Sequence, residues 1–556
     1  MVSIVHRCGL TNYVTDYVDL HDESIELEGH QSQLNISINK VNNQNIHQTL
    51  IGIVHFSSSH SSTCKKKGFF LKKFTPFFSS FNNVWVRTNK FKYTHDTYAR
   101  VRIDWNKSDM NKIECSVEEY IGSLSSFDLE PKVIKQLVSS HWSSKIDRFI
   151  LNYDFTHDNI TNRENLNVVT YSIDPIGCKD IDDALHYRYI NGYHEIGVHI
   201  ADVSSYFSLD SKIWIEMCSR VESIYMPDEI IHMYPEIFST QIASLREGRI
   251  SRAFSLIIIL DNKYNIIKKS LHRTNINVKN LSYDDIEKMK GVDNDINNLY
   301  SIGEALSKKI LKTNEYNSHK LVETFMVLAN STVAQILVDS KLNISPLIRV
   351  QKSYNMLKES NNGMINYLKV PRALYKHYSE NISNKHNGLD LDLYTHFTSP
   401  IRRFADVIVH QLLTAVMYND SNLVPNYGVD VIYKLNYYKH YYKKCVIYQN
   451  EINLVSELDD SYKDIKGVVL DLYDNKCRVL VSCNNKEFIF DITLYHHKLN
   501  KTINITHDTD KIIFTDFNKE LKIGDNITVR VCYMPLKLRK LKAYIVEPIF
   551  MKKLLE

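Results

Sequence analysis

Four aspartates lie within the segment Asp174–Asp183, which has the sequence D-P-I-G-C-K-D-I-D-D. Carboxylates this close repel one another, and the apolar neighbours Ile173 and Ile181 would raise their pKa values unless a cation neutralises them. A hard divalent cation is the natural partner, because Mg²⁺ prefers a few carboxylates, several waters and the phosphate oxygens of a substrate. The segment therefore predicts a metal site that acts on a phosphate-bearing substrate.

The residues before the acidic segment indicate how it is presented. The β-prone run Val168–Ile173 predicts a strand, and Pro175–Gly177 predicts a turn that places the acids at the end of this strand. One alternative is a solvated acidic loop. A Ca²⁺-binding loop is a second alternative, which is disfavoured because the glycine required at its sharp turn is absent.

A second segment, Ser399–Arg403, predicts the start of a helix, with Ser399 as the N-cap and Pro400 as the first helical residue. The apolar stripe that follows leaves Arg402 and Asp406 together on another face. An arginine in the first turn opposes the helix dipole unless an anion lies there, so Arg402 predicts a phosphate contact. The alternative is a surface ion pair between Arg402 and Asp406.

The two segments resemble the signatures of the ribonuclease II family, which includes ribonuclease R and the catalytic subunit of the exosome. The sequence I-D-P-x-x-x-K-D-x-D-D-A resembles the acidic motif of this family, and Tyr394–Asp406 resembles its second signature, with Phe404 where tyrosine is common. The shorter motifs V-H-I-A-D-V, Y-M-P and S-L-R lie between them in the family's order. The resemblance covers roughly residues 167–413 strongly and both flanks weakly.

The resemblance implies a role for each acid. Asp174 and Asp183 are expected to ligate metal, Asp180 to support the same cluster, and Asp182 to act most directly in cleavage while it also contacts metal. Arg402 is expected to neutralise charge on the phosphoryl group. The expected metal is Mg²⁺, with Mn²⁺ as an alternative.

The resemblance also implies residues that contact RNA. Tyr225 lies where a ring that clamps the terminal bases is expected, although a packed tyrosine is the alternative. Tyr283 and Glu323 match positions that contact the ribose, whose 2′-hydroxyl both donates and accepts hydrogen bonds. Glu323 is expected on an apolar helix face, where its burial would be unfavourable without such a partner. Arg403 is expected as a further RNA contact.

At 556 residues the chain is too long for one core and should divide into about three domains. The predicted fold is multidomain, with an α+β RNB catalytic domain over 148–458. The resemblance implies OB-type β-barrels on both sides, a cold-shock-like one over 1–147 and an RNA-binding one over 459–556. The hydrophobic patterns predict strands at 168–173, 194–203 and 253–260, and helices at 302–312, 321–340 and 402–417.

The flanking regions carry weaker signals. Lys65–Phe74 alternates lysines with phenylalanines, which predicts either a platform for single-stranded nucleic acid or a basic hairpin with inward rings. Residues 1–45 give no clear fold. Short β-prone runs at 467–470, 477–481, 487–490 and 527–531, before the basic residues Lys537, Arg539, Lys540 and Lys542, predict the C-terminal barrel.

Composition limits the class of protein. The net charge of +4 is too small to identify a polyanionic partner by itself. The nine cysteines lack any C-x-x-C pair and are expected to be reduced thiols. The apolar run Ala253–Leu260 is too short to span a bilayer. These features predict a soluble intracellular protein without membrane contact. We further expect a monomer that is cytoplasmic rather than nuclear or organellar, although these features do not specify either.

The resemblance implies a processive 3′-to-5′ exoribonuclease that hydrolyses single-stranded RNA to nucleoside 5′-monophosphates with a divalent metal. A catalytically inactive RNB-fold protein that binds RNA is the main alternative. An endonuclease or a DNA nuclease with the same metal chemistry is the third.

Overall fold

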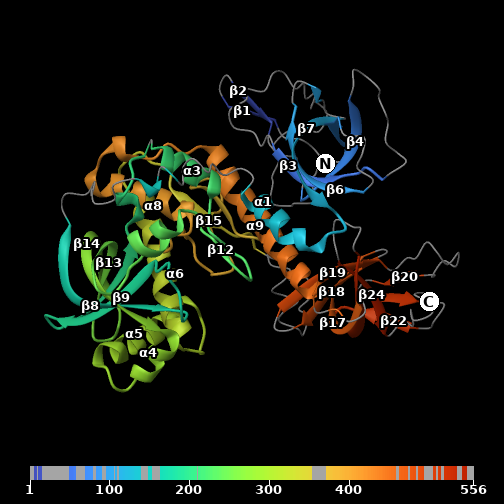
Figure 1. The fold of residues 1–556 in the computed structure, drawn as a ribbon. Coiled ribbons are helices and arrows are strands. Elements are labelled where there is room, and N and C mark those ends of the chain that lie inside the picture. Colours follow the sequence, from blue (N-terminus) through green and yellow to red (C-terminus); the bar gives the residue numbers. More distant parts are fainter. Residues whose placement is uncertain are drawn as a thin grey trace. The chain divides into compact units, whose positions relative to one another are not determined.

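The computed structural model describes residues 163–353 and 371–456, apart from Asp210, together with parts of the two flanking regions (Figure 1). In the flanks it describes residues 5–8, 11–14, 49–57, 69–78, 83–89, 95–104, 107, 108, 112–139, 148, 150–152, 458, 462–473, 476–483, 486–493, 505–508, 511–514, 519–534 and 541–547. The chain divides into two compact units. One comprises Met1–His141, Ser360–Ile365 and Tyr441–Glu556, and the other comprises Trp142–Glu359 and Asn366–His440. The predicted domain boundaries at 147 and 458 stay predictions.

The second unit is built on a closed barrel with the strand order β10-β13-β14-β8-β9. Most neighbouring strands are antiparallel, but β14 and β8 run parallel. Alternate side chains of β13, such as Phe254, Leu256 and Ile258, are fully buried, as a strand with one face inside a barrel requires. The strands are β8 (Glu164–Asp174), β9 (Asp183–Ile190), β10 (Tyr193–Ala201), β13 (Ile250–Leu260) and β14 (Ile266–Ser282). The three strands predicted for this region are confirmed.

Helices pack around this barrel, with α4 and α5 beside β8 and β9 (Figure 1). The three predicted helices are present, although their bounds differ by several residues. The helices are α3 (Lys212–Arg220), α4 (Tyr283–Met289), α5 (Asn294–Ile310), α6 (Ser318–Val338), α8 (Phe404–Tyr418) and α9 (Val429–Val455). By length and composition α6 is apolar enough to cross a membrane, but 61% of its most apolar window is buried in the protein.

The predicted start of α8 is wrong. The helix begins at Phe404 with Arg403 as its N-cap, so Ser399, Pro400 and Arg402 precede it. The Ser399 N–H donates to the side chain of Asp406 at 2.7 Å, which reverses the direction expected for a serine cap. Tertiary contacts hold this segment in turns and override the local helix-start signal.

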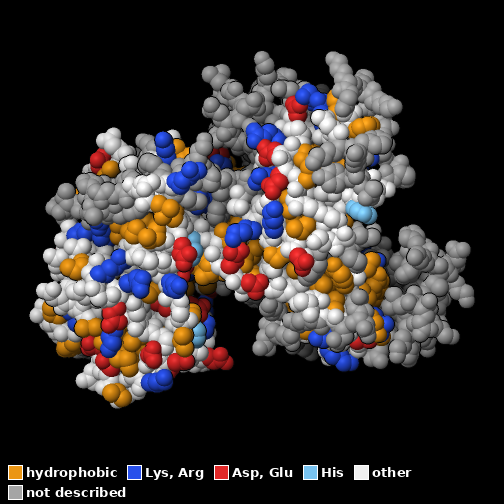
Figure 2. All heavy atoms as spheres, in the orientation of Figure 1, with side chains coloured by type: hydrophobic (Ala, Val, Ile, Leu, Met, Phe, Trp, Pro, Cys, Tyr) orange, Lys and Arg blue, Asp and Glu red, His pale blue; other side chains and the backbone are white. Residues whose placement is uncertain are grey.

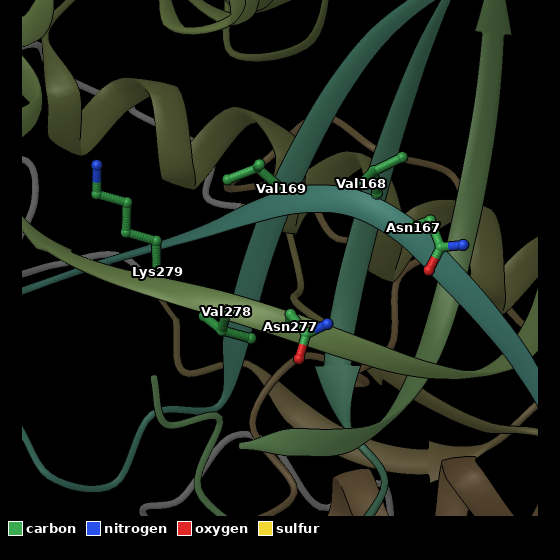
Figure 3. A pocket seen from close by; sticks show the side chains of 6 residues that line it. All are labelled: Asn167, Val168, Val169, Asn277, Val278 and Lys279. Carbon is green, nitrogen blue, oxygen red and sulfur yellow. The ribbon is translucent and has the colours of Figure 1, made fainter. Parts of the chain in front are cut away.

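A shallow pocket of about 320 Å³ lies on the barrel wall between β8 and β14 (Figure 3). The register between these strands shifts between Asn275 and Asn277, so the two strands part there. Asn167, Val168, Val169, Asn277, Val278 and Lys279 line the pocket. None of the four aspartates is among them, so the pocket is separate from the acidic segment.

In the first unit, the N-terminal region forms a closed barrel with the order β3-β4-β5-β7-β6. Phe74 is buried in its core, whereas Phe69 and Phe70 are half-buried and Lys73 is exposed. The inward-ring interpretation thus holds for Phe74, and residues 65–68 of that segment lie outside the described residues. The strands are β3 (Thr49–Val54), β4 (Phe70–Pro76), β5 (Val84–Thr88), β6 (Thr97–Ile103) and β7 (Ile113–Ser123), followed by α1 (Glu130–Ser139).

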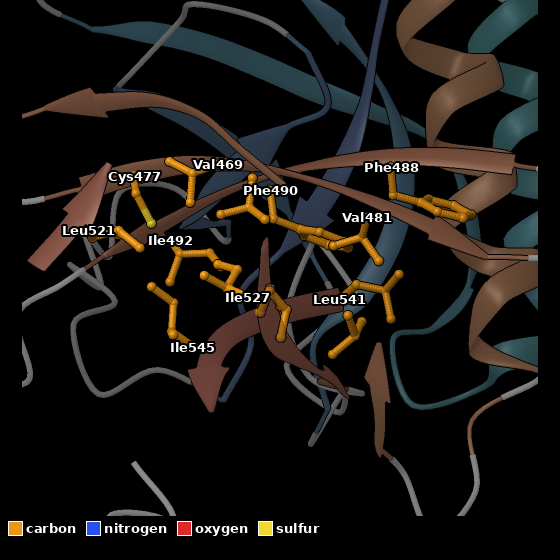
Figure 4. Packing of buried hydrophobic residues seen from close by; sticks show 14 of the residues in the cluster. Val469, Cys477, Val481, Phe488, Phe490, Ile492, Leu521, Ile527, Leu541 and Ile545 are labelled. Atoms are coloured by element: carbon orange, nitrogen blue, oxygen red, sulfur yellow. The ribbon is translucent and has the colours of Figure 1, made fainter. Parts of the chain in front are cut away.

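The C-terminal region forms a five-stranded sheet with the order β19-β18-β17-β23-β24, whose edge strands β19 and β24 approach each other. Its buried face gathers Val469, Val481, Phe488 and Ile527 into one core (Figure 4). The strands are β17 (Tyr462–Tyr473), β18 (Lys476–Cys483), β19 (Lys486–Thr493), β23 (Asn526–Tyr533) and β24 (Leu541–Glu547). OB-type barrels therefore flank the central region of the sequence, as predicted. Lys537, Arg539 and Lys540 lie outside the described residues.

The face drawn in Figure 2 carries mixed charge, and the cysteines whose side chains the structure describes are unpaired. On the face drawn in Figure 2, lysine and arginine side chains are interspersed with aspartate and glutamate. Seven cysteines whose side chains the structure describes are free thiols, namely Cys115, Cys178, Cys218, Cys445, Cys477, Cys483 and Cys532.

Candidate active site

The barrel brings the four aspartates to one of its ends. Asp174 is the last residue of β8 and Asp183 is the first residue of the neighbouring strand β9. The connecting loop carries Asp180 and Asp182, which are both buried. The sequence placed the acids at the end of a strand, and the structure confirms this placement.

The S-L-R segment holds the acidic loop in place. The Ser244 hydroxyl donates to the carbonyl of Lys179 at 2.8 Å and accepts from the N–H of Ile181 at 3.1 Å. The Leu245 N–H donates to the carbonyl of Ile181 at 3.0 Å. Ser244 therefore supports the site through the backbone, a role that its position in a short motif did not reveal.

Asp182 is the acid that meets the arginine segment. The Arg402 Nε donates to its Oδ2 at 2.9 Å, and the backbone N–H of Ile401 donates to its Oδ1 at 2.9 Å. The Arg402 Nη2 also donates to the Ser399 hydroxyl at 2.9 Å. The structure thus pairs Arg402 with Asp182 in place of the surface pair with Asp406 that was the alternative, and the 40% exposed Arg402 side chain stays open to solvent.

The carboxyl groups are poorly stabilised as anions. Burial raises the pKa of Asp182 to about 7, although Arg402 and the Ile401 N–H counteract this rise. Burial raises the pKa of Asp174 to about 6, with Asp180 adding to the rise. The pKa of Asp183 lies well above its usual range, again first because of burial and then because of Asp174 and Asp182. Such carboxylates gain stability from an added cation.

Among the described residues, no three Asp, Glu, His or Cys side chains lie close enough together to hold a metal ion as they stand. Asp182 is occupied by protein donors, and the Asp180 Oδ2 accepts from the Tyr225 hydroxyl at 2.5 Å. By contrast, the Asp174 Oδ2 is buried without a hydrogen-bond partner. The donor chemistry fits Mg²⁺, but the carboxylates would have to turn toward one another.

Two of the predicted RNA-contacting residues lie beside the acids. Tyr225, on β11 (Ile224–Tyr225), is 44% exposed and reaches Asp180 through its hydroxyl. Tyr283 directly follows Ser282, which pairs with Asp174 across the parallel strands β14 and β8. Burial raises the pKa of Tyr283 to about 12, and Asp183 and Asp174 add to the rise. Its ring stacks on His319, with centroids 3.7 Å apart, a contact that the sequence did not indicate.

The other two predicted contacts lie in different surroundings. Glu323 is exposed and pairs with Lys320 on the same helix at 2.6 Å. The Arg403 Nη2 donates to Asp406 at 2.8 Å. The Arg403 backbone forms an isolated antiparallel bridge with Glu222, close to the strand of Tyr225. The roles of both residues stay predictions.

Comparison with known proteins matches this region to one family. The RNB domain profile matches residues 163–313 and 297–419. The chain is 29% identical to Ribonuclease R 2 of Lactococcus lactis over 343 residues, which cover 48% of this chain and 51% of that protein. It is 29% identical to the exosome complex exonuclease dis3 of Schizosaccharomyces pombe over 395 residues, covering 56% of this chain and 40% of that protein. The chain thus spans about half or less of the length of these relatives.

Solved structures show the same fold over most of the chain. The apo form of Mycoplasma genitalium RNase R superposes with a TM-score of 0.67 at 18% identity, covering 90% of this chain and 89% of that one. The complex of Mycoplasma genitalium RNase R with ribose-methylated single-stranded RNA superposes with a TM-score of 0.68 at 18% identity, covering 96% of each chain. The yeast pseudonuclease Ssd1 gives 0.63 at 18% identity, covering 82% of this chain and 66% of that one. The fold, the acidic loop with its arginine and the matched profile agree, and residues 163–419 of the chain match the RNB domain.

Proposed function

We propose that this chain is a 3′-to-5′ exoribonuclease that hydrolyses single-stranded RNA processively to nucleoside 5′-monophosphates. The observation that carries the proposal is the junction at one end of the barrel, where Arg402 meets Asp182 within a group of four carboxylates. The names of the relatives, ribonuclease R and exosome exonuclease, support RNA as the substrate. The RNA bound in the related Mycoplasma genitalium structure supports a single strand.

Asp174, Asp180, Asp182 and Asp183 would hold the divalent cation, with Asp174 Oδ2 already free to ligate. The bound cation would neutralise the carboxylates and activate water for attack on the phosphodiester. The raised pKa values of Asp174 and Asp182 support this assignment, because they mark carboxylates that protein donors leave under-stabilised.

Arg402 would bind the phosphate at the bond that is cut. Two of its nitrogens, Nε and Nη2, are fixed by Asp182 and Ser399, which holds the guanidinium in one orientation. Its Nη1 has no partner among the residues that the structure describes, and this nitrogen is the donor that remains for a phosphoryl oxygen. Prepositioned charge of this kind stabilises the transition state without reorganisation.

Tyr225 and Tyr283 would position the end of the strand. The exposed ring of Tyr225 offers a stacking surface next to Asp180, to which its hydroxyl is anchored. Tyr283 lies beside Asp174 and Asp183, where its hydroxyl would face the sugar of a nucleotide bound at Arg402. A phenol that donates to a 2′-hydroxyl favours RNA over DNA.

Two observations favour a second candidate, a catalytically inactive protein that binds RNA. The fold also matches a pseudonuclease, and no three metal-ligating side chains converge in the described part of the chain. The crowded carboxylates oppose this candidate, because a protein that only binds RNA gains nothing from their mutual repulsion.

Incubation of the protein with 5′-labelled single-stranded RNA and Mg²⁺ tests both candidates. Stepwise shortening to a small labelled core supports the exonuclease. Unchanged RNA that nevertheless binds supports the inactive protein, and internal cuts or digestion of DNA would contradict both.

The variant Asp182→Asn sharpens the test, because it removes the acid that orients Arg402. We expect RNA binding to stay within a few-fold and turnover to fall by about 10³-fold. Asp390→Asn is a matched control, since Asp390 is an exposed aspartate that pairs with Lys312 and Lys385. The Asp390→Asn control should keep full activity. If Asp182→Asn keeps full activity as well, the assignment of Asp182 is refuted.

A further inference from the structure

Two stacked rings lie at the junction of α4 and α6, and only one of them belongs to the predicted site. The Tyr283 ring lies against the His319 ring, with centroids 3.7 Å apart and an interplanar angle of 23°. Tyr283 is the first residue of α4 and is half-buried, whereas His319 is the second residue of α6 and is exposed. The proposed function assigns no role to His319.

Hydrogen bonds fix the start of each helix. The Ser282 hydroxyl accepts from the Asp285 N–H at 3.1 Å, and the Asp285 side chain accepts from the Ser282 N–H at 3.1 Å, which caps α4. The Ser318 N–H at the start of α6 donates to the Glu287 Oε1 of α4 at 2.7 Å. The backbones that carry the two rings are therefore fixed relative to each other.

The stack restricts a ring that the protein otherwise leaves partly free. A ring in a close-packed interior is held on all sides, whereas the half-buried Tyr283 ring has solvent on part of its surface. A parallel ring at this distance covers one face of the phenol and opposes its rotation about χ1. His319 therefore has a large share in setting the orientation of the Tyr283 side chain.

The orientation of Tyr283 matters because the residue lies beside the acids. Its neighbour Ser282 pairs with Asp174 across β14 and β8. Burial, and then Asp183 and Asp174, raise the pKa of Tyr283 to about 12, so its hydroxyl stays protonated near pH 7 and can donate a hydrogen bond. The direction of the ring decides whether this donor meets a nucleotide bound beside the acids.

His319 also lies one helical turn before Glu323 on α6. Residues four positions apart share one face of a helix, and both of these side chains are exposed. The two residues predicted to contact the ribose, Tyr283 and Glu323, come from different helices. His319 contacts the first of them and shares a helix face with the second.

We propose that His319 is a positioning residue, which holds the Tyr283 hydroxyl in place to read the 2′-hydroxyl of the RNA strand. The inference deepens the proposed function and rests on it. His319 acts through the face of its ring and not through its nitrogens, so another aromatic ring can replace it. Without the ring Tyr283 rotates more freely, and RNA loses a hydrogen bond that DNA never makes.

Competition binding with matched single strands of RNA and DNA tests this role in the Asp182→Asn background, which is expected to bind strands without cutting them. We expect His319→Ala to weaken RNA binding about 5-fold and to leave DNA binding within about 2-fold. A general disturbance of the fold would weaken the binding of both strands. His319→Phe should restore the RNA affinity, because it keeps a stacking ring, and a failure of this rescue would contradict a role through the ring face.

A double-mutant cycle tests whether His319 acts through Tyr283. Tyr283→Phe removes the hydroxyl but keeps the ring, and it should also weaken RNA binding about 5-fold. Both substitutions remove the same hydrogen bond, so His319→Ala combined with Tyr283→Phe should weaken RNA binding no more than Tyr283→Phe alone. Effects that multiply would show that His319 acts independently of Tyr283 and would overturn the positioning role.

His272→Ala is the matched control and should leave the binding of both strands unchanged. His272 is a partly exposed histidine of the same unit, and it pairs with Glu164, which begins β8 at the end away from Asp174.

The possible outcomes separate this inference from the proposed function. If the Asp182→Asn parent prefers RNA but His319→Ala behaves like the His272→Ala control, the positioning role is wrong and the proposed function stands. A Tyr283→Phe protein that keeps the full preference for RNA overturns the inference as well, since His319 would then have no hydroxyl to position. If the parent itself does not bind RNA, the proposed function fails.

Discussion

Asp182 and Asp202 are both buried aspartates that face arginine side chains in the same unit, yet their surroundings act on them in opposite directions. Asp202 meets two arginines, Arg163 at 2.7 Å and Arg273, and it accepts from the Ser204 hydroxyl. These two arginines hold its pKa well below its usual range although burial opposes them. Asp182 meets one arginine and several other carboxyl groups, and burial raises its pKa to about 7.

The difference separates a structural charge from a functional one. Asp202 pairs with Arg163 and Arg273, which lie 39 and 71 residues away in the chain, and these ion pairs contribute to the stability of the barrel. Asp182 is left short of positive charge, a state that lowers stability and makes sense where a cation or substrate completes the site. Three of the predictions below test this contrast in stability, in its pH dependence and in its response to a cation.

The largest effect is expected for Asp202→Asn. The substitution leaves Arg163 and Arg273 buried with no carboxylate between them, so we expect a loss of about 3–5 kcal/mol in the free energy of unfolding. Urea unfolding followed by tryptophan fluorescence measures this loss. Asp390→Asn, an exposed control, should change little, and an Asp202→Asn protein that unfolds at the wild-type urea concentration would remove the contrast.

The second prediction concerns pH. Because the pKa of Asp182 is raised from 3.8 to about 7, the folded protein binds more protons than the unfolded chain between these values, and its stability falls as pH rises. Without metal, the free energy of unfolding of Asp182→Asn should therefore rise relative to that of the wild type between about pH 5 and about pH 7, by at most about 1.4 kcal/mol per pH unit.

Asp202→Asn should behave differently over the same range. The pKa of Asp202 lies below its unfolded value, so its stabilising effect is fully present above 3.8 and is lost only as pH falls further. The difference in free energy of unfolding between the wild type and Asp202→Asn should therefore be constant from about pH 5 to about pH 7. Parallel pH curves for Asp182→Asn and the wild type would show that Asp182 is not under-stabilised.

The third prediction concerns Mg²⁺. A cation that binds only the folded protein stabilises it by about 1.4 kcal/mol when its free concentration is about ten times Kd. We expect this gain in wild type and in Asp202→Asn, measured by urea unfolding at constant ionic strength with K⁺ as the reference salt. Asp182→Asn should show a clearly smaller gain, and equal gains in all three proteins would place the cation elsewhere.

The sequence predicted the Asp182 side of this contrast but not the Asp202 side. The four acids are close together in the chain, so local crowding alone predicted a cation site, and β-prone runs predicted the strands that present them. Arg402 lies 220 residues from Asp182, and only the resemblance to a family connected the two. Asp202 lies in the short motif V-H-I-A-D-V, but the sequence did not connect it to Arg163 and Arg273, because the barrel brings these residues together from distant parts of the chain.

The wrong helix start has the same cause. Ser399 and Pro400 satisfy a local capping rule, but Asp406 accepts from the Ser399 N–H and Asp182 fixes Arg402. Long-range hydrogen bonds thus decided a boundary that propensity alone assigned elsewhere. The exposure of Glu323 also depends on which face of α6 packs inward, which an almost uniformly apolar helix does not specify.

The smallest effect is expected for Glu323→Ala, which adds an exposed acid to the comparison. Glu323 is 44% exposed in its side chain and pairs with the partly exposed Lys320, so the free energy of unfolding should change by less than about 0.5 kcal/mol. If Glu323 contacts the ribose, the variant should lose part of the preference for RNA over DNA, by a few-fold, in competition binding with matched strands. Lys320→Ala removes the partner and is the control, because it should leave that preference intact. A preference that is unchanged in Glu323→Ala but reduced in Tyr283→Phe would transfer the reading of the sugar to Tyr283, the residue that the structure places beside Asp174 and Asp183.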